Sequence, residues 1–190
     1  MNFSVKNLLP CNHIVRYGYD MEKDFISRLK EDYNENEEMY GVEYVKIDEK
    51  NLKILEKVRK FLNDNGYSTI DTKLDSSNCI IEIHFANTVN KEYAHSAFAV
   101  HQESEGDFEN VSTLICYITN TGEGGEFGIY RNGDESSLFC KIPTNSTDNL
   151  IPCIMFDDKL WHYPQPFRNG TRFALSFHIK SRRDTIYIND

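Results

Sequence analysis

The sequence predicts one domain of the α+β class, mainly β, in which N-terminal helices precede an antiparallel sandwich or barrel. Up to Gly66 the chain holds two segments with apolar side chains at helical spacing, and after it come short apolar or alternating runs separated by Gly, Asn, Asp and Pro. The 190 residues suit one domain, and no repeat, low-complexity segment or linker marks a boundary. We therefore assign residues 1–190 to one domain, with helical support over about 20–66 and a β core over about 79–180.

Two helices are predicted in the first third of the chain. Residues 21–33 carry apolar side chains at helical spacing behind Asp20, which suits an N-terminal cap. Residues 48–62 place their apolar side chains on one face and are followed by a glycine that suits a helix end. We interpret residues 11–19 as a short strand and residues 39–47 as a strand or a loop.

The remaining chain predicts seven or eight short strands. Each run is apolar or alternating and is bounded by turn residues, which is typical of an antiparallel sandwich or barrel. The helices, which come first, are expected to cover one face of the β unit. The expected strands are residues 79–86, 96–103, 112–119, 125–131, 137–142, 150–157 and 171–180.

Composition and hydropathy disfavour several classes of protein. Hydrophobic residues make up 39% and aromatic residues 13%, enough for a packed core. The formal net charge of -9 repels phosphate backbones and disfavours nucleic-acid binding. No apolar stretch of about 18 residues occurs and the N-terminus has no signal-like apolar region, so we expect a cytoplasmic protein without a membrane partner. Five cysteines without a CxxC spacing predict buried free thiols rather than disulfides or a zinc site.

Three residues suit a transition-metal site. His101 and Glu103 stand two apart at the end of an expected strand, so both side chains point to the same face. His162 follows well downstream, where a neighbouring strand can bring it close. Two His and one carboxylate on one side of a metal ion are typical of non-haem Fe(II) oxygenases. The H-x-[DE] pair alone also arises by chance about once in such a chain, and a His beside aromatic residues is often only a packed core residue.

The last expected strand carries a polar face. With period two, Arg172, Ala174, Ser176 and His178 share one face, while the residues between them are large and apolar and predict the core. A guanidinium on an enclosed strand needs a partner, and a ligand carboxylate bound through two hydrogen bonds is a good one. An internal ion pair with one of the many acidic residues is the alternative.

Five ordered features of the chain resemble the 2-oxoglutarate/Fe(II)-dependent dioxygenase superfamily, and in particular its prolyl-hydroxylase-like branch. The resemblance covers about residues 79–180. The features are His101-x-Glu103, the strand Leu114–Asn120, the start of a strand at Gly124-Gly125-Glu126-Phe127, His162, and Gly170-x-Arg172.

The resemblance implies a double-stranded β-helix, a jelly-roll or cupin-like barrel buttressed by N-terminal helices. It implies that His101, Glu103 and His162 bind Fe(II) and are the catalytic metal ligands. Most relatives have Asp where this chain has Glu103, and the extra methylene requires the strand or the rotamer to adjust. Because a carboxylate stands at this position, hydroxylation is favoured over halogenation.

The resemblance also implies a binding site for 2-oxoglutarate. Arg172 pairs with its distal carboxylate, Tyr117 donates its hydroxyl to the same carboxylate, and Ser176 lines the pocket. His178, at a position where relatives often carry Trp, is a weaker candidate for the floor of the pocket. His84 is interpreted as a core residue, although it could touch 2-oxoglutarate or the substrate.

The implied activity is hydroxylation of a C–H bond with molecular oxygen and 2-oxoglutarate, with ascorbate as a candidate accessory reductant. The leading substrate is a peptidyl residue such as proline. A free amino acid or another small metabolite is the alternative, as is a degenerate barrel that binds without catalysis. Asp157 and Asp158 are interpreted as turn residues, and residues 91–95 as a candidate substrate loop.

Overall fold

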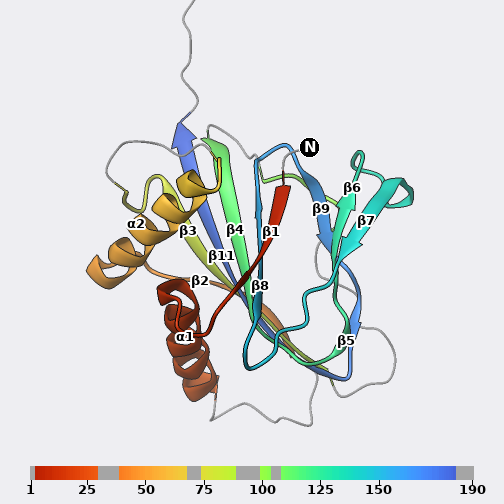
Figure 1. Ribbon diagram of the computed structural model, residues 1–190, viewed down its shortest axis with the longest axis horizontal. Coiled ribbons are helices and arrows are strands. Elements are labelled where there is room, and N and C mark those ends of the chain that lie inside the picture. Colours follow the sequence, from red (N-terminus) through yellow and green to blue (C-terminus); the bar gives the residue numbers. More distant parts are fainter. Residues whose placement is uncertain (1–2, 30–38, 68–73, 89–98, 104–107, 183–190) are drawn as a thin grey trace, which may run out of the picture.

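The computed structural model describes residues 3–29, 39–67, 74–88, 99–103 and 108–182. The largest element is a six-stranded antiparallel sheet, with the two helices on one face and a smaller sheet on the other (Figure 1). In sheet order its strands are β1 (Phe3–Leu8), β8 (Ile151–Phe156), β4 (Phe108–Asn120), β11 (Gly170–Arg182), β3 (Cys79–Thr88) and β2 (Met39–Tyr44).

The smaller sheet and a short strand pair complete the β structure. A one-turn 3-10 helix, Glu135–Ser137, precedes β7. Among the described residues the sheets do not join into one continuous hydrogen-bonded barrel, and an isolated bridge between His101 and His162 extends the smaller sheet. The smaller sheet has the order β7 (Leu138–Ile142), β6 (Phe127–Tyr130), β9 (Trp161–Pro164), and the pair is β10 (Phe167–Arg168) with β5 (Glu123–Gly124).

Helix α1 (His13–Leu29) begins earlier than the sequence predicted. The side chain of Asn12 accepts a hydrogen bond from the backbone N–H of Ile14 at 2.8 Å, which is the capping role assigned to Asp20. The strand predicted at residues 11–19 is therefore wrong, because a capped helix places the apolar side chains of this segment against the sheet. The expected end of the helix, after Leu29, lies outside the described residues.

Helix α2 (Glu49–Asp64) agrees with the prediction. Asp48 caps its first turn by accepting from the backbone N–H of Asn51 at 2.9 Å. Gly66 follows with a φ of 84°, a conformation that a glycine adopts without strain.

Three other segments differ from the expectations or refine them. Residues 39–44 form the edge strand β2, which settles the choice between strand and loop. Strand β1 was not predicted; it pairs with β8 at the other edge of the large sheet. Within the described part of residues 96–103, only His101 makes a β bridge, so residues 99–103 contribute a single pairing to the predicted strand.

The main core lies between the large sheet and the helices. Phe173, Leu175, Phe177 and Ile179 of β11 are fully buried there, as the alternation predicted. The ring of Phe25 on α1 contacts Phe173, with centroids 5.8 Å apart. Burying several large aromatic and aliphatic side chains, each worth about 1.5–3 kcal/mol, fixes the helices on this face and leaves the other face free for a site.

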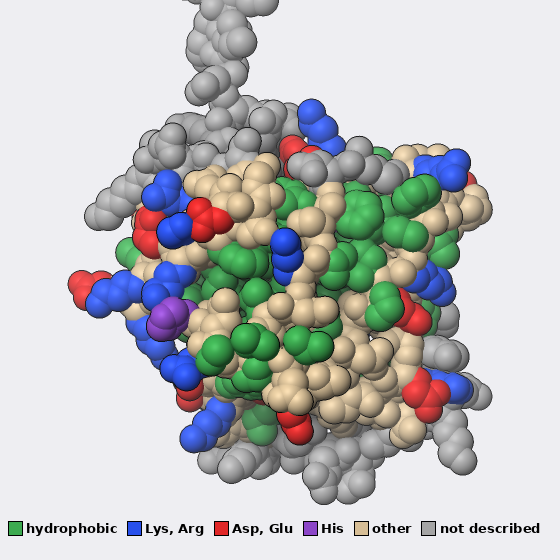
Figure 2. All heavy atoms as spheres, in the orientation of Figure 1, with side chains coloured by type: hydrophobic (Ala, Val, Ile, Leu, Met, Phe, Trp, Pro, Cys, Tyr) green, Lys and Arg blue, Asp and Glu red, His purple; other side chains and the backbone are tan. Residues whose placement is uncertain are grey.

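The cysteines are free thiols, and the outer surface carries charges of both signs (Figure 2). All five cysteines are free thiols, as predicted. Burial is confirmed for Cys79, Cys116 and Cys153, whereas Cys11 is exposed and Cys140 is half-buried. The surface seen in Figure 2 carries Lys and Arg side chains next to Asp and Glu, mostly around its edge, with apolar side chains nearer the centre. Among the described residues no helix is long and apolar enough to cross a membrane.

Candidate metal centre

A cavity of about 610 Å³ lies between the large sheet and the smaller one. Small-molecule sites commonly have volumes of about 300–1,000 Å³. The four alternate residues of β11 that the sequence placed on its polar face all line this cavity. They are Arg172, Ala174, Ser176 and His178.

The pairing of β11 with its neighbours arranges the cavity wall in rungs. Ala174 lies opposite His84 on β3 and Tyr117 on β4, and Ser176 lies opposite Glu82 on β3. Since directly opposed residues in antiparallel strands project to the same face, the polar side chains of three strands meet in one cavity.

His101 and His162 come together through one backbone pairing. The N–H of His101 donates to the carbonyl of His162 at 3.1 Å, and the N–H of His162 donates back at 3.0 Å. The two imidazoles therefore project to the same side, with ring centroids 4.3 Å apart. Residues 61 positions apart in sequence thus meet as the sequence analysis expected.

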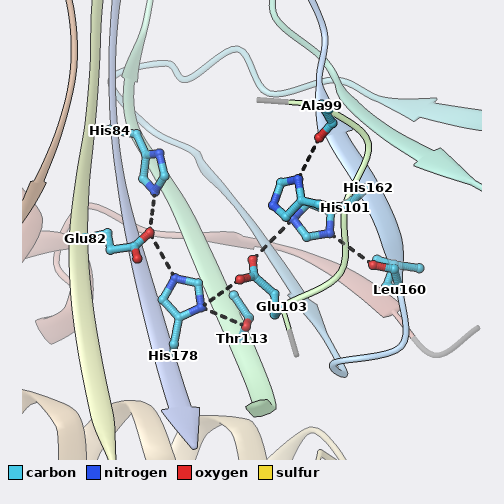
Figure 3. Close-up of polar contacts among 9 residues, drawn as sticks. All are labelled: Glu82, His84, Ala99, His101, Glu103, Thr113, Leu160, His162 and His178. Carbon is cyan, nitrogen blue, oxygen red and sulfur yellow. Dashed lines mark hydrogen bonds and ion pairs between the residues drawn. The ribbon is translucent and has the colours of Figure 1, made fainter. Parts of the chain in front are cut away.

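Each of these imidazoles has its Nδ1 bound to a backbone carbonyl two residues earlier (Figure 3). The distances are 2.8 Å from His101 to Ala99 and 3.1 Å from His162 to Leu160. A carbonyl only accepts, so Nδ1 carries a hydrogen and Nε2 is the nitrogen left to face a metal ion. A metal-binding histidine usually has its other ring nitrogen bonded in this way, to a backbone carbonyl or a carboxylate.

Glu103 completes a group of three possible ligands. Its Oε1 lies 3.3 Å from Nε2 of His162, and the ligand atoms of the three residues all lie within 4.8 Å of one another. Ligands on adjacent corners of an octahedron, with metal bonds of about 2.1 Å, are separated by about 3 Å. The residues present therefore fit a divalent metal ion of this size.

The environment of Glu103 keeps its carboxylate ionised. Burial raises its pKa, but the nearby imidazoles of His178, His162 and His101 outweigh burial and hold the pKa at about 2. A carboxylate that stays negative at neutral pH in an enclosed cavity suits a cation.

The wall beside β11 carries an enclosed positive charge. Nη1 of Arg172 donates to the carbonyl of Gly125 at 3.3 Å, and its guanidinium lies over the Phe167 ring, 5.1 Å from the centroid. Burial lowers the pKa of Arg172, but a guanidinium remains charged. No ion pair joins Arg172 to a carboxylate of the described residues, so in this part of the chain the internal ion pair considered as an alternative does not form.

Tyr117 and Ser176 lie in the same cavity. Tyr117 is 3% exposed, and burial raises its pKa to about 12 while Arg172 opposes the shift. Its hydroxyl therefore stays protonated and able to donate near neutral pH. Ser176 is also buried and lines the cavity, one rung beyond the pair of Ala174 and Tyr117 on the side away from Arg172.

A polar network that was not predicted from the sequence lies across the cavity from the imidazoles of His101 and His162 (Figure 3). Glu82 Oε2 lies 3.1 Å from His84 Nε2 and 3.4 Å from His178 Nε2. His84 was interpreted as a core residue, yet it is partly exposed to the cavity. The period-two alternation of β3 predicts that Glu82 and His84 share a face. The register between β3 and β11, which sets Glu82 beside His178, cannot be read from the sequence.

Two aromatic rings enclose the metal side of the cavity. Phe127 stacks on His162 with centroids 5.1 Å apart and planes at 16°, and Phe156 lies at 4.7 Å. His162 is only 2% exposed as a result. Asp157 accepts from the N–H of Lys159 at 3.2 Å in a turn before β9, in line with the turn interpretation. The loop 91–95 lies outside the described residues.

No protein-family model matches the sequence, and no curated protein matches it either. Solved structures do resemble it. A prolyl-4-hydroxylase from Pseudomonas putida aligns with 95% of this chain and 92% of its own, with a TM-score of 0.55 and 13% identity. A prolyl hydroxylase from Trichoplax adhaerens, in complex with a hypoxia inducible factor oxygen degradation domain peptide fragment, aligns with 93% of this chain and 82% of its own (TM-score 0.54, 11% identity). A truncated viral collagen prolyl hydroxylase from Paramecium Bursaria Chlorella virus-1 covers 93% and 89% (TM-score 0.50, 17% identity).

The chain has the double-stranded β-helix fold of the 2-oxoglutarate/Fe(II) dioxygenases. The resemblance seen in the sequence is therefore confirmed for the fold. With identities of 11–17%, the likeness in fold leaves the activity to be argued from the side chains.

Proposed function

We propose that the protein is an Fe(II)- and 2-oxoglutarate-dependent dioxygenase that hydroxylates a C–H bond. One observation carries the proposal: a metal-binding triad and an enclosed guanidinium without a described acidic partner line the same cavity. A metal chelator with a second, distal carboxylate needs both features at once. The dioxygenase-like fold supports the same assignment.

His101, Glu103 and His162 would hold the iron. The Nδ1 contacts of His101 and His162, and the pairing of their backbones, fix the two imidazoles before any metal binds. This lowers the free-energy cost of ordering them on binding. When bound, the iron supplies the activation of molecular oxygen. Phe127 and Phe156 pack against His162 and exclude water from this side.

Arg172 would bind the distal carboxylate of 2-oxoglutarate through a charge-assisted, two-pronged contact. Tyr117 would donate its hydroxyl to the same carboxylate, and Ser176 would line the pocket beside it. Because Arg172 is held by the Gly125 carbonyl and the Phe167 ring, its guanidinium is oriented in advance.

For the substrate we propose a peptidyl residue, with proline as the leading candidate. The edge strand β2 lines the cavity and exposes Tyr40, Val42 and Tyr44, with Tyr44 69% exposed. An apolar edge strand beside the reaction chamber suits an extended peptide. The two solved prolyl hydroxylases with the higher TM-scores support this choice. A free amino acid or another small metabolite is the alternative, and ascorbate and the cytoplasm remain predictions of the sequence.

The test is succinate formation from 2-oxoglutarate by the purified protein with Fe(II), with and without ascorbate. We expect turnover even without substrate, and we expect Glu103→Ala and Arg172→Ala to lower it by about tenfold or more. Arg16→Ala is the matched control, because Arg16 is an exposed residue of α1, on the opposite face of the large sheet. An unmodified protein that binds metal and 2-oxoglutarate without forming succinate would instead be a binding module.

A further inference from the structure

The metal carboxylate of this chain belongs to a glutamate, which has one more side-chain torsion than an aspartate. The carboxylate of Glu103 can therefore take more orientations, including one in which both oxygens face a single metal ion. Such chelation would occupy a coordination position that the co-substrates need. A side chain that fixes the outer oxygen would prevent it.

Both oxygens of Glu103 already have separate neighbours. Oε1 faces Nε2 of His162 at 3.3 Å, on the metal side. Oε2 faces Nδ1 of His178 at 3.5 Å, on the opposite side (Figure 3). Together, the two contacts favour a single orientation of the carboxylate.

His178 is buried, and each edge of its ring faces a polar side chain. It is 3% exposed, and its Nδ1 lies 3.2 Å from the hydroxyl of Thr113 on β4. Its Nε2 lies 3.4 Å from Glu82, which in turn contacts His84 at 3.1 Å. A buried ring that bonds Thr113 on one neighbouring strand and contacts Glu82 on the other can support Glu103 from this side.

We propose that His178 is a positioning residue for the metal centre: it holds the outer oxygen of Glu103, so that the glutamate gives the metal one oxygen. The inference rests on the proposed function and adds a role for a residue outside the ligand triad. It explains how the longer carboxylate fits here, because the added reach is taken up by the contact with β11.

Two similar substitutions separate this role from a structural one. The amide of Asn ends where Nδ1 of His178 lies, and the amide of Gln ends where Nε2 lies. His178→Asn therefore keeps a donor toward Glu103, whereas His178→Gln keeps one toward Glu82. Both variants are polar and neutral, so loss of bulk or charge affects them alike.

The readout is the dissociation constant for Mn(II), a divalent stand-in for Fe(II), measured by titration calorimetry. We expect His178→Gln to weaken Mn(II) binding by about 10–100-fold, the range typical of lost supporting contacts. His178→Asn should stay within about threefold of the unmodified protein. His84→Gln, which removes an imidazole of the same network that does not touch Glu103, should also stay within about threefold.

A second measurement keeps the inference testable if a His178 variant fails to fold. Glu103→Asp shortens the side chain and withdraws its carboxylate from His178. Thr113→Val removes the hydroxyl that faces His178. Thr113→Val should therefore weaken Mn(II) binding in the protein that carries Glu103, and should have little further effect in the Glu103→Asp variant. Equal affinities of His178→Asn and His178→Gln, or additive effects in the second experiment, would overturn the positioning role. If the unmodified protein binds no Mn(II), the proposed function fails together with the positioning role. If the unmodified protein binds Mn(II) and only the results for the variants differ from those expected, the positioning role alone fails.

Discussion

Tyr117 and Glu82 are two residues whose surroundings fix their protonation. Burial dominates at Tyr117 and raises the pKa of its hydroxyl to about 12. At Glu82, burial acts in the same direction, but contacts with His178 and His84 outweigh it and hold the pKa well below the usual 4.5. One residue is thus a lasting donor and the other a lasting anion, and each leads to a measurable consequence.

Tyr117→Phe should weaken 2-oxoglutarate binding by about tenfold or more, since a hydrogen bond to a charged group contributes about 1.5–3 kcal/mol. The raised pKa adds a second expectation. The hydroxyl is lost only as the pH approaches about 12, so the affinity difference between the two proteins should be constant from about pH 7 to 9. Calorimetric titration of the Mn(II)-loaded proteins with 2-oxoglutarate measures both. A difference that shrinks across this range contradicts the assignment.

Glu82→Gln should destabilise the protein near neutral pH. The folded pKa lies below the unfolded value, so the ionised carboxylate stabilises the fold above about pH 4.5 and this contribution is lost as the pH falls further. We expect a loss of about 1–3 kcal/mol in the free energy of unfolding at pH 7, and a smaller difference at about pH 4. Urea unfolding at the two pH values measures it. Glu56→Gln, at an exposed pair on α2, is the control and should change little.

At the scale of elements, β11 serves two purposes through its alternation. Its residues 173, 175, 177 and 179 pack against the helices, and the intervening ones line the cavity. A bulge in its pairing with β4 lies between Phe173 and Ala174, next to Arg172. The start of β11 is also where the turn after β5 approaches, so the backbone there sets the position of the guanidinium.

Gly125 in that turn offers the corresponding test. Its φ is +70°, and a Cβ there would lie 2.9 Å from Nη1 of Arg172. Gly125→Ala should cost about 1–2 kcal/mol in stability and also weaken 2-oxoglutarate binding, because the added methyl displaces the guanidinium. Thermal unfolding and calorimetry measure the two effects. Gly41→Ala, where a Cβ would meet nothing within 4 Å, should leave stability within about 0.5 kcal/mol. Unchanged 2-oxoglutarate affinity in Gly125→Ala would mean that the turn does not orient Arg172.

At the scale of the molecule, the candidate ligand His162 and the Arg172 guanidinium belong to different sheets. His162 lies on β9 of the smaller sheet, and Arg172 lies on β11 of the large one. A metal ion with a chelating co-substrate would link the two walls and stabilise their packing. Binding should therefore be visible in the stability of the whole chain.

Mn(II) and 2-oxoglutarate together should raise the thermal unfolding midpoint more than Mn(II) alone. Metal at about 100 times its dissociation constant contributes about 2.7 kcal/mol, and the co-substrate adds a term of the same form. Differential scanning fluorimetry with a chelator as reference measures the shifts. Glu103→Ala should lose most of the response to metal, and Arg172→Ala only the additional response to 2-oxoglutarate. A full response in Glu103→Ala would place the metal elsewhere.

Much of this arrangement could be predicted from the sequence because it depends on local periodicity. The two faces of β11, the apolar face of helix α2, and the shared face of residues 101 and 103 all follow from spacing along one segment. The N-terminal elements were harder. Asn12 and Asp20 are both acceptable caps, and only the packing of residues 14–18 against the sheet favours the earlier start. Strand β1 is short and half exposed, so its pattern carries little signal.

The sequence by itself determined the types of candidate ligand, their order and the polar face of the last strand, since these follow from residue identity and from a period of two. Only the tertiary structure decided that His101 pairs with His162, that Arg172 lies without a described acidic partner, and that His178 faces Glu103. Each of these depends on register between strands far apart in the chain. A shift of one residue turns every side chain to the opposite face, and the choice of register is made by burial of the whole core rather than by any one segment.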